Sequence, residues 1–389
     1  MSRKILVLNS GSSSVKYRLF AVTGKADCVP LVSGQVERIG EAASGVADHR
    51  QAIHAMVRSL ESGGYLAEEE LLAVGHRVVH GGESFNQSVI TDDTVIAAIR
   101  AAIPLAPLHN PPNLEGIEAC RDRWPRVPQV AVFDTAFHQT LTPEAYRYAI
   151  PDSAYRDYHI RRYGFHGTSF AHITRSMAEY LGRPRESLNL IVLHLGNGAS
   201  ACAIRAGRSI DTSMGMTPLA GLMMGTRGGD LDPGVILFWL EQLGESAENI
   251  SRWLNRDSGL KGIAGTNDMR DVLARAANDE PDARLALAMY VHRIRHYLGA
   301  YRALLPKLDG LVFTGGVGEH AAAIRAAVCR DLGHLGLHLD EAANAGNQSG
   351  IAELQSPLSA IKILVVPADE EAEIARQSIE LLGNQGLLT

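Results

Sequence analysis

The chain has 389 residues, of which 46% are hydrophobic and 21% are charged, and its formal net charge at pH 7 is -6. A single compact core rarely exceeds about 250–300 residues, so this length predicts two domains. The acidic balance excludes a general attraction to nucleic acid or to anionic membranes, and we expect neither as a partner.

The sequence carries no sign of secretion or membrane insertion. The first apolar run, 5–8, is too short for a secretory signal, and no run reaches the ~18 residues of a membrane span. The four cysteines are scattered, which predicts neither a disulfide framework nor a thiolate metal site. We therefore expect a cytoplasmic protein.

Strand-like apolar runs alternate with segments of helical periodicity, which indicates an α/β fold. Segments 4–8 and 15–20 are predicted to pair as a hairpin around a serine-rich turn. The other predicted strands are 74–80, 129–133, 190–195, 201–205, 310–314 and 362–366, and the predicted helices are 51–60 and 283–305. The boundary between the two domains is expected within 137–157.

Two segments resemble each other. Residues 5–14 read ILVLNSGSSS and residues 191–200 read IVLHLGNGAS, and each is an apolar strand that enters a turn of glycine, serine and asparagine. This repeat predicts a duplicated domain with a phosphate-binding loop in each half. In the first loop, Gly11 permits a close approach of the backbone and Lys16 adds a positive charge. The alternative is an ordinary serine-rich hairpin turn, and the P-loop spacing is absent.

Two charged side chains stand in or next to predicted buried strands. Arg77 lies within an apolar strand, where a charge is costly unless it is paired, so it is predicted either to bind an anionic ligand or to form a structural pair with an aspartate. Asp134 follows strand 129–133, at an edge where α/β sheets bind ligands, and it could hold Mg²⁺ or cap the next segment.

Several loops present polar residues next to glycine or proline. The proline-rich loop 107–113 is predicted to display His109, Asn110 and Asn113, while glycines flank His166 and Arg227. Segment 313–319, FTGGVGE, has the glycines that let a helix N-terminus approach a nucleotide. One acid of segment 367–371, PADEE, could hold Mg²⁺. Alternatively, the acids could stabilise the start of a final helix through its dipole.

In order along the chain, ten segments resemble the acetate kinase family of the actin and sugar-kinase superfamily: NSGSSSVKY, GHRVVHGGE, PLHNPPN, VFDTAFHQT, YGFHGTS, HLGNGAS, DTSMGMTPL, GTRGGD, FTGGVGE and PADEE. The resemblance implies two duplicated actin-like (ribonuclease H-like) α/β domains with an active-site cleft between them. It implies an N-terminal domain of 1–137 plus 370–389 and a nucleotide-binding domain of 138–369. A homodimer is also implied.

The resemblance also assigns roles to residues. Catalytic roles fall on Arg77, Asp134, His166 and Arg227, metal binding on Asn9 and Glu370, and substrate binding on Arg77, Val79, His109 and Pro218. Nucleotide binding falls on Ser12, Ser14, Lys16, His194, Asn197, Gly198, Asp268, Met269, Arg270, Gly316 and His320. The chain departs from the family pattern at Ser10, at Met269 (usually aromatic), and at His320 and Asp369 (usually asparagine).

The activity implied is reversible, ATP-dependent phosphorylation of acetate to acetyl phosphate, with ATP as co-substrate and Mg²⁺, or alternatively Mn²⁺, as cofactor. A carboxylic acid is already ionised at neutral pH, so no general base is needed, and direct in-line transfer is expected. A covalent phospho-Glu370 intermediate is the mechanistic alternative. The sequence also leaves open a propionate kinase, a hydroxyl-directed kinase with Asp134 as its base, and an actin-like assembly protein.

Overall fold

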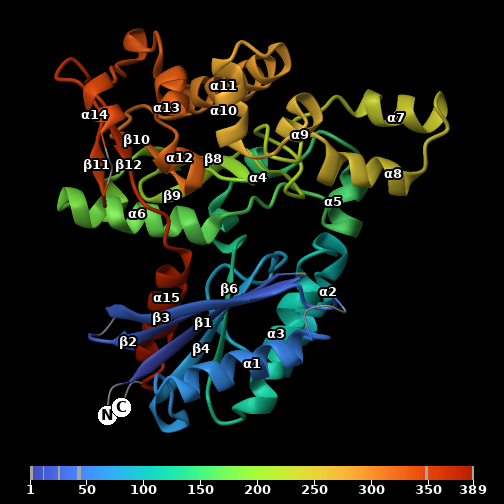
Figure 1. Ribbon diagram of the computed structural model, residues 1–389, viewed down its shortest axis with the longest axis vertical. Coiled ribbons are helices and arrows are strands. Elements are labelled where there is room, and N and C mark those ends of the chain that lie inside the picture. The colour runs from blue at the N-terminus through green and yellow to red at the C-terminus, as the bar shows by residue number, and fades with distance from the viewer. Residues whose placement is uncertain (1–2, 12, 25–26, 42–44, 347–348, 388–389) are drawn as a thin grey trace. The chain divides into compact units, whose positions relative to one another are not determined.

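The computed structural model describes residues 3–11, 13–24, 27–41, 45–346 and 349–387. The chain divides into two compact units (Figure 1). The first unit comprises Met1–Gln139, Gly167–His172 and Asp369–Thr389, and the second comprises Thr140–His166 and Ile173–Ala368. The chain therefore passes from the first unit to the second after Gln139 and returns to the first after Ala368. The short segment Gly167–His172 also belongs to the first unit. The domain boundaries at 137/138 and 369/370 stay a prediction.

The first unit is built on a six-stranded sheet in the order β3-β2-β1-β4-β6-β5. The strands are β1 (Lys4–Ser10), β2 (Ser14–Val22), β3 (Cys28–Glu37), β4 (Leu71–Val78), β5 (Val89–Ile90) and β6 (Gln129–Phe133). Strands β1, β2 and β3 form an antiparallel meander, which confirms the predicted hairpin, while β4 and β6 continue parallel to β1. The short β5 pairs antiparallel with β6 at the edge of the sheet.

Helices cover both faces of this sheet (Figure 1). They are α1 (His49–Ser62), α2 (Asp93–Ala101), α3 (Asn110–Arg123) and α15 (Glu370–Asn384), with 3₁₀ turns at Glu68–Glu70, Ile103–Leu105 and Ala136–Thr140. Side chains of a strand alternate between the faces, so Leu6 and Leu8 pack toward α1 and α3 while Ile5 and Val7 pack toward α15. Burial of both faces explains the continuous apolar run that made β1 predictable.

The second unit repeats this plan with the sheet order β11-β12-β10-β7-β8-β9. Its strands are β7 (Leu190–Leu195), β8 (Ala199–Arg205), β9 (Arg208–Thr212), β10 (Gly310–Thr314), β11 (Ala352–Glu353) and β12 (Lys362–Val365). The meander β7–β8–β9 is antiparallel and is followed by β10 and β12 parallel to β7, as in the first unit. This repeated order confirms the duplication predicted from segments 5–14 and 191–200.

Helices of the second unit vary in length, and the predicted helix 283–305 is confirmed as α11. They are α4 (Pro143–Tyr146), α5 (Asp152–Tyr158), α6 (Gly167–Leu181), α7 (Pro233–Glu241), α8 (Ala247–Arg252), α9 (Gly259–Ala264), α10 (Met269–Ala277), α11 (Pro281–Leu304), α12 (Gly315–His320), α13 (Ala322–Cys329) and α14 (Glu341–Ala345), with a π-turn at Trp253–Asp257 and 3₁₀ turns at Arg185–Ser187 and Gly333–Leu335. The first residues of α6, Gly167–His172, are those that group with the first unit. No helix in the described ranges combines the length and apolar character that a membrane span requires.

Candidate active site

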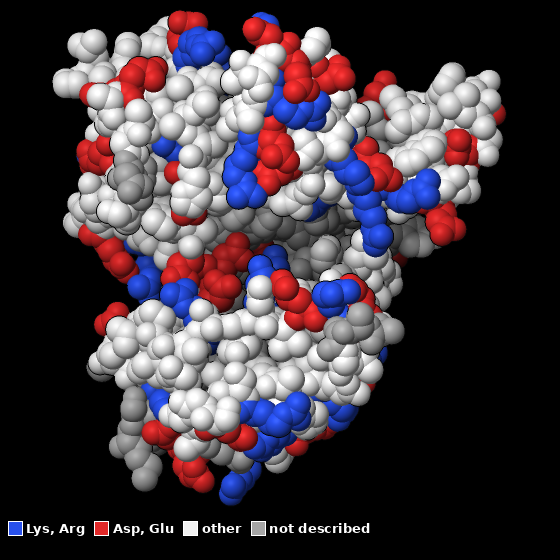
Figure 2. Space-filling view, in the orientation of Figure 1, with Lys and Arg blue, Asp and Glu red and all other residues white. Residues whose placement is uncertain are grey.

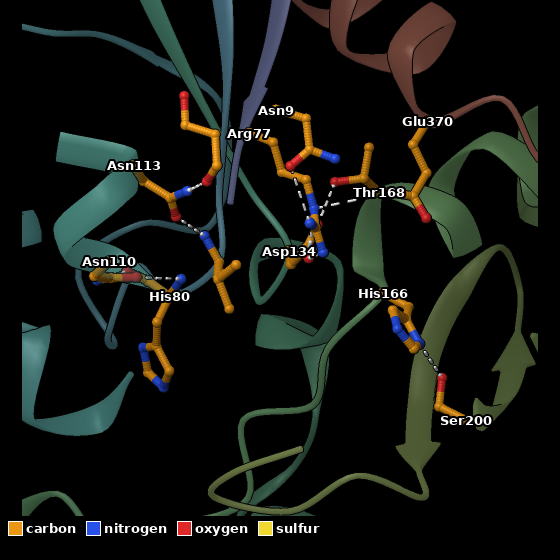
Figure 3. A network of polar contacts seen from close by, with 12 residues as sticks. Asn9, Arg77, His80, Asn110, Asn113, Asp134, His166, Thr168, Ser200 and Glu370 are labelled. Atoms are coloured by element: carbon orange, nitrogen blue, oxygen red, sulfur yellow. Dashed lines mark hydrogen bonds and ion pairs between the residues drawn. The ribbon is translucent and has the colours of Figure 1, made fainter. Parts of the chain in front are cut away.

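Polar side chains converge in the first unit where three parallel strands end. Arg77 projects from the end of β4, and its Nη2 and Nε lie 2.5 and 3.0 Å from Oδ2 of Asp134, which follows β6 (Figure 3). Its Nη1 donates to Oδ1 of Asn9 on β1 at 3.3 Å, and Oε2 of Glu370 lies 3.8 Å from Nε. The structure therefore brings together four of the predicted site residues, at the sheet edge where α/β folds bind ligands.

The charge of Arg77 is compensated within this cluster. Burial lowers the pKa of the Arg77 guanidinium, but the carboxylates of Asp134 and Glu370 outweigh burial, and the net shift is upward. Asp134 is 1% exposed, so removing the arginine would leave a buried carboxylate without its cation. Of the two sequence interpretations of Arg77, the aspartate pair is present, and the ligand-binding interpretation stays a prediction.

Asp134 is held from a second side by the start of α6. Thr168 Oγ1 donates to Oδ1 of Asp134 at 2.9 Å, and the Gly167 amide donates to the Asp134 carbonyl at 2.9 Å. A Cβ on Gly167 would lie 2.1 Å from that carbonyl oxygen, so only glycine fits here. Both carboxylate oxygens of Asp134 thus accept hydrogen bonds from side chains. Among the described contacts, neither oxygen accepts from a backbone amide of the following segment, which the capping interpretation requires.

Glu370 is the first residue of α15 and its side chain is 21% exposed. Burial, together with the neighbouring charges of Asp134 and Glu371, raises the pKa of Glu370 to about 7, although Arg77 and Lys16 act in the opposite direction. This carboxyl is therefore poorly compensated in the absence of a cation. Binding of a divalent ion would relieve the repulsion between the carboxylates.

The donor atoms of the cluster suit Mg²⁺. Carboxylate oxygens of Asp134 and Glu370 and the amide oxygen of Asn9 are the hard oxygen donors that Mg²⁺ prefers, and the ion usually keeps several waters. Within the described ranges no three His, Cys, Asp or Glu side chains form a metal cluster of their own. The residues fit an ion that is held by one or two carboxylates and completes its shell with water and phosphate.

The loop after β4 is fixed by two asparagines of α3. Asn113 accepts from the Val79 amide at 3.0 Å and donates to the Ser10 carbonyl at 2.7 Å, while Asn110 accepts from the His80 amide at 3.1 Å and donates to its carbonyl at 3.0 Å. Both asparagines are buried, so the prediction that a proline-set loop displays them is wrong. The prolines open helix α3 instead, since proline is favoured in a first helical turn.

The other residues predicted for the first unit have varied positions. Val79 is buried, and His109 is exposed just before α3. Lys16 is exposed on β2 opposite Asn9, and Ser14 begins β2 where its carbonyl accepts from the Gly11 amide at 2.8 Å. The remaining loop residue, Ser12, lies outside the described residues.

A second group of predicted residues converges in the second unit. His166 adopts a left-handed backbone (φ 57°), and its Nδ1 lies 2.9 Å from Ser200 Oγ (Figure 3). Its ring stacks on His194 at 4.3 Å between centroids. A Cβ on Gly198 would lie 3.4 Å from His166 Nε2 and 3.2 Å from Arg227 Nη2. The structure therefore brings His166, His194, Gly198 and Arg227 together around the β7–β8 turn.

Arg227 is partly buried and has no opposite charge beside it among the described residues. Its Nη1 donates to the Pro218 carbonyl at 2.8 Å, and within the described residues it forms no ion pair with a carboxylate. Burial lowers the pKa of the Arg227 guanidinium. A desolvated cation of this kind binds an anion strongly, because the anion supplies the missing charge.

The six remaining predicted nucleotide residues line one cavity of the second unit. Its volume is about 520 Å³, and the predicted lining residues are Asn197, Asp268, Met269, Arg270, Gly316 and His320. Leu260, Leu273 and Val317 add apolar surface, which suits the face of a nucleobase. Asp268 pairs with Arg270 at 2.5 Å, and this hydrogen bond lowers the pKa of Asp268 to about 2.

Helix α12, which carries part of this cavity, is held by a buried arginine that the sequence did not single out. Arg325 is 1% exposed and donates to the carbonyls of Gly318 and Glu319 at 3.0 and 2.8 Å. It also donates to Asn344 at 2.8 Å. Arg325 therefore satisfies the carbonyl groups at the end of α12, which otherwise lack partners.

Residues 4–376 match the family model described as the acetokinase family. This chain belongs to the acetokinase family. It is 48% identical to the acetate kinase of Syntrophobacter fumaroxidans over 99% of this chain and 98% of that protein. It is 49% identical to the acetate kinase of Leifsonia xyli over 97% of this chain and 98% of that protein.

Solved structures of this family share the fold of the chain. The crystal structure of Porphyromonas gingivalis acetate kinase matches with a TM-score of 0.91 at 42% identity and covers 98% of this chain and 100% of its own. A propionate kinase from Francisella tularensis matches with a TM-score of 0.89 at 41% identity, over 96% of this chain and 98% of its own. As an acetokinase-family protein, the chain therefore has the predicted α/β fold of two duplicated actin-like domains.

Proposed function

We propose that this acetokinase-family protein is an acetate kinase, which transfers the γ-phosphoryl group of ATP to acetate and forms acetyl phosphate and ADP. The observation that carries this proposal is the engagement of Asp134. A hydroxyl-directed kinase needs a base, yet both oxygens of Asp134 accept from Arg77 and Thr168. A carboxylate acceptor is already ionised and needs no base, and two relatives that match nearly the whole chain are named acetate kinase.

Charge neutralisation is the main task of the proposed site. Acetate and the triphosphate repel each other, and Arg77 and Arg227 supply fixed positive charges to the acid and the transferring phosphoryl group. His166 is oriented by Ser200 and can donate a hydrogen bond to that group. Positioning and electrostatic stabilisation then provide most of the rate, as is typical of phosphoryl transfer.

Asn9 and Glu370 would hold Mg²⁺, or Mn²⁺ in its place, and Asp134, whose two oxygens accept from Arg77 and Thr168, would act on the ion through water in its shell. The bound ion would neutralise part of the phosphate charge. Direct in-line transfer is favoured over a phospho-Glu370 intermediate, because the acid substrate is already an ionised nucleophile at neutral pH and Glu370 is proposed to hold the metal ion. Inversion of configuration at a chiral γ-phosphorus would support direct transfer, and net retention would support the covalent route.

Acetate is favoured over propionate by the names of the relatives, although the Francisella structure carries the name propionate kinase. Val79 and Pro218 are proposed to limit the length of the acid. One methylene in an apolar pocket changes selectivity by about 1–3 kcal/mol, so some activity on propionate is expected. The kcat/KM ratio for the two acids measures this preference directly.

A homodimer in the cytoplasm is also proposed. Helix α7, PGVILFWLE, has no buried residue within this chain, and Leu237 and Phe238 are each 53% exposed. Figure 2 shows mostly uncharged surface over this segment. Such a contiguous apolar helix is typical of a surface that a partner covers, and a second copy is the partner that the family resemblance implies.

The decisive test is a hydroxylamine trap. The protein is incubated with ATP, Mg²⁺ and acetate, propionate, butyrate or glycerol, and the hydroxamate formed from acyl phosphate is quantified. The unaltered protein should form hydroxamate with acetate. Arg77→Ala and Arg227→Ala should each lower the rate of hydroxamate formation by at least about 100-fold, because each removes a charge that acts in the transition state. Release of ADP without hydroxamate from any acid would contradict the proposal.

A further inference from the structure

The loop that carries Arg227 is closed at its base by one aspartate. The Asp230 amide donates to the Gly221 carbonyl at 3.0 Å, and the Gly221 amide donates to Oδ1 of Asp230 at 2.8 Å. A Cβ on Gly229 would lie 2.3 Å from the same carbonyl oxygen, so the two ends of the loop are in tight contact. Asp230, at the end of the loop, therefore binds Gly221, at its beginning, through both its backbone and its side chain.

The second oxygen of Asp230 joins this base to helix α11. Tyr297 Oη donates to Oδ2 at 2.7 Å, and Nη1 of Arg293 lies 3.1 Å from the same oxygen. Arg293 and Tyr297 are four residues apart and so lie on one face of the helix. Burial, together with the Asp230 carboxylate, raises the pKa of the Tyr297 hydroxyl, which therefore remains protonated and able to donate.

Helix α11 provides a firm support for these bonds. Its residues Tyr290, Ile294, Leu298 and Tyr301 are buried in the second unit, at intervals of about one helical turn. A packed helix of this length moves less than a glycine-rich loop. The contacts of Asp230 therefore fix the base of the loop relative to the core of the unit.

Arg227 depends on this loop for its position. Within the described residues its guanidinium donates one hydrogen bond, to the Pro218 carbonyl, and forms no ion pair. The loop backbone beside Arg227 is held by the Met224 amide, which donates to the Arg227 carbonyl at 2.9 Å, and by the Gly225 and Ser258 amides, which donate to the carbonyls of Asn197 and Thr226 at 3.0 and 3.1 Å. The guanidinium itself has one hydrogen bond, to Pro218, which precedes Gly221, so its position depends on how Asp230 joins the two ends of the loop.

We propose that Asp230 is a positioning residue for phosphoryl transfer, which holds Arg227 in place by joining the Gly221–Asp230 loop to Arg293 and Tyr297 of α11. This inference rests on the proposed function, since it takes Arg227 as the group that binds the reacting anion. In this proposal Asp230, whose side chain is 42% exposed, acts through Arg227 and not on the substrate, since its carboxylate contacts are to Gly221, Tyr297 and Arg293.

The test is a double-mutant cycle between Asp230→Asn and Arg227→Ala. Asparagine keeps an oxygen acceptor for Gly221 but loses the charge that pairs with Arg293. Initial rates of acetyl hydroxamate formation give kcat and KM for acetate and for ATP. The matched control is Asp279→Asn, since Asp279 also pairs with an arginine but its side chain is 84% exposed.

We expect Asp230→Asn to lower kcat/KM by about 10–100-fold, because small misplacements of a catalytic group have effects of this size. In the Arg227→Ala background the same change should cost less than about 2-fold, because the group that Asp230 positions is gone. Tyr297→Phe removes only one hydrogen bond and should show the same non-additivity with a smaller loss, which keeps the test valid if Asp230→Asn folds poorly. The control should have no effect in either background.

Equal losses in the wild-type and Arg227→Ala backgrounds would overturn the proposal, because they indicate a general structural role. An unchanged kcat/KM in both Asp230→Asn and Tyr297→Phe would overturn it as well. Failure of the proposed function is recognised separately, because the unaltered protein would then form no hydroxamate from any acid.

Discussion

Replacement of Glu370 by glutamine should stabilise the ligand-free protein while it removes activity. The carboxyl is 21% exposed, and burial together with Asp134 and Glu371 raises its pKa to about 7 from an ordinary 4.5. The folded state therefore binds a proton between pH 4.5 and 7 that the unfolded state has released, and stability falls as pH rises through this window. Glutamine has similar size and no charge, so it avoids this loss.

The magnitude follows from the shift in pKa. Each unit corresponds to about 1.4 kcal/mol, so a rise of about 2.5 units gives about 3 kcal/mol above pH 7. Solvent reaches a fifth of the side chain and reduces this figure, and we expect Glu370→Gln to raise the free energy of unfolding of the first unit by about 2–3 kcal/mol at pH 8. At pH 4.5 and below the two proteins should be equally stable.

The assay is urea unfolding from pH 4 to 8 with tryptophan fluorescence. Trp124 is buried in the core of the first unit, whereas Trp239 and Trp253 lie in the second, so a background with both of the latter replaced by phenylalanine reports on the unit that contains Glu370. A variant that is less stable than wild type at pH 8, or a stability difference that does not change with pH, would refute the reasoning. Loss of hydroxamate formation in the same variant is the accompanying functional result.

Three further predictions concern other parts of the chain. Gly167→Ala should destabilise the first unit by about 2–3 kcal/mol in urea unfolding, because its Cβ would overlap a carbonyl, whereas Gly299→Ala, in open space, should not destabilise the protein. Arg325→Met should raise KM for ATP more than KM for acetate, because the end of α12 loses its hydrogen-bond donors; equal changes in both constants would contradict this role. Glutamates in place of Leu237 and Phe238 should give a monomer by size-exclusion chromatography with light scattering, and a dimer of unchanged mass would exclude α7 from the interface.

Strands are best predicted from the sequence where both faces of the sheet are buried. The segments 129–133, 190–195 and 310–314 are β6, β7 and β10 to the residue, because strands that are buried on both faces read as nearly continuous apolar runs. The predicted strand 74–80 is β4, which begins earlier and ends at Val78. Strand β3 is not predicted, since it is an edge strand whose alternation is confined to its second half, where the partly buried Val32 and Val36 alternate with exposed residues, and its first half is mostly exposed. Strands β5 and β11 are only two residues long and carry no pattern at all.

Parts of the candidate site could be found from the sequence and parts could not. Arg77 and His166 are recognisable because a charge inside an apolar run and a histidine between glycines are locally unusual. The roles of Asn113, Thr168 and Asp230 depend on contacts with distant segments, and nothing in their own neighbourhoods indicates which atoms they bind. For Asn113, a signal was present in the sequence: two prolines precede it, and proline is favoured in the first turn of a helix, which indicates a helix and not a loop at this position.

The placement of α15 has a consequence for the order of folding during synthesis. Ile374, Ile379 and Leu382 of this helix cover the face of the first sheet that carries Ile5 and Val7, although they are made more than three hundred residues later. A nascent chain ending at Ala368 already holds every strand of the second unit, but its first sheet still exposes an apolar face. Domains usually fold in the order in which they leave the ribosome. Here the second unit can complete its folding before the first. The uncovered apolar face of the first sheet is then open to aggregation, and a chaperone would have to shield it, until α15 has left the ribosome.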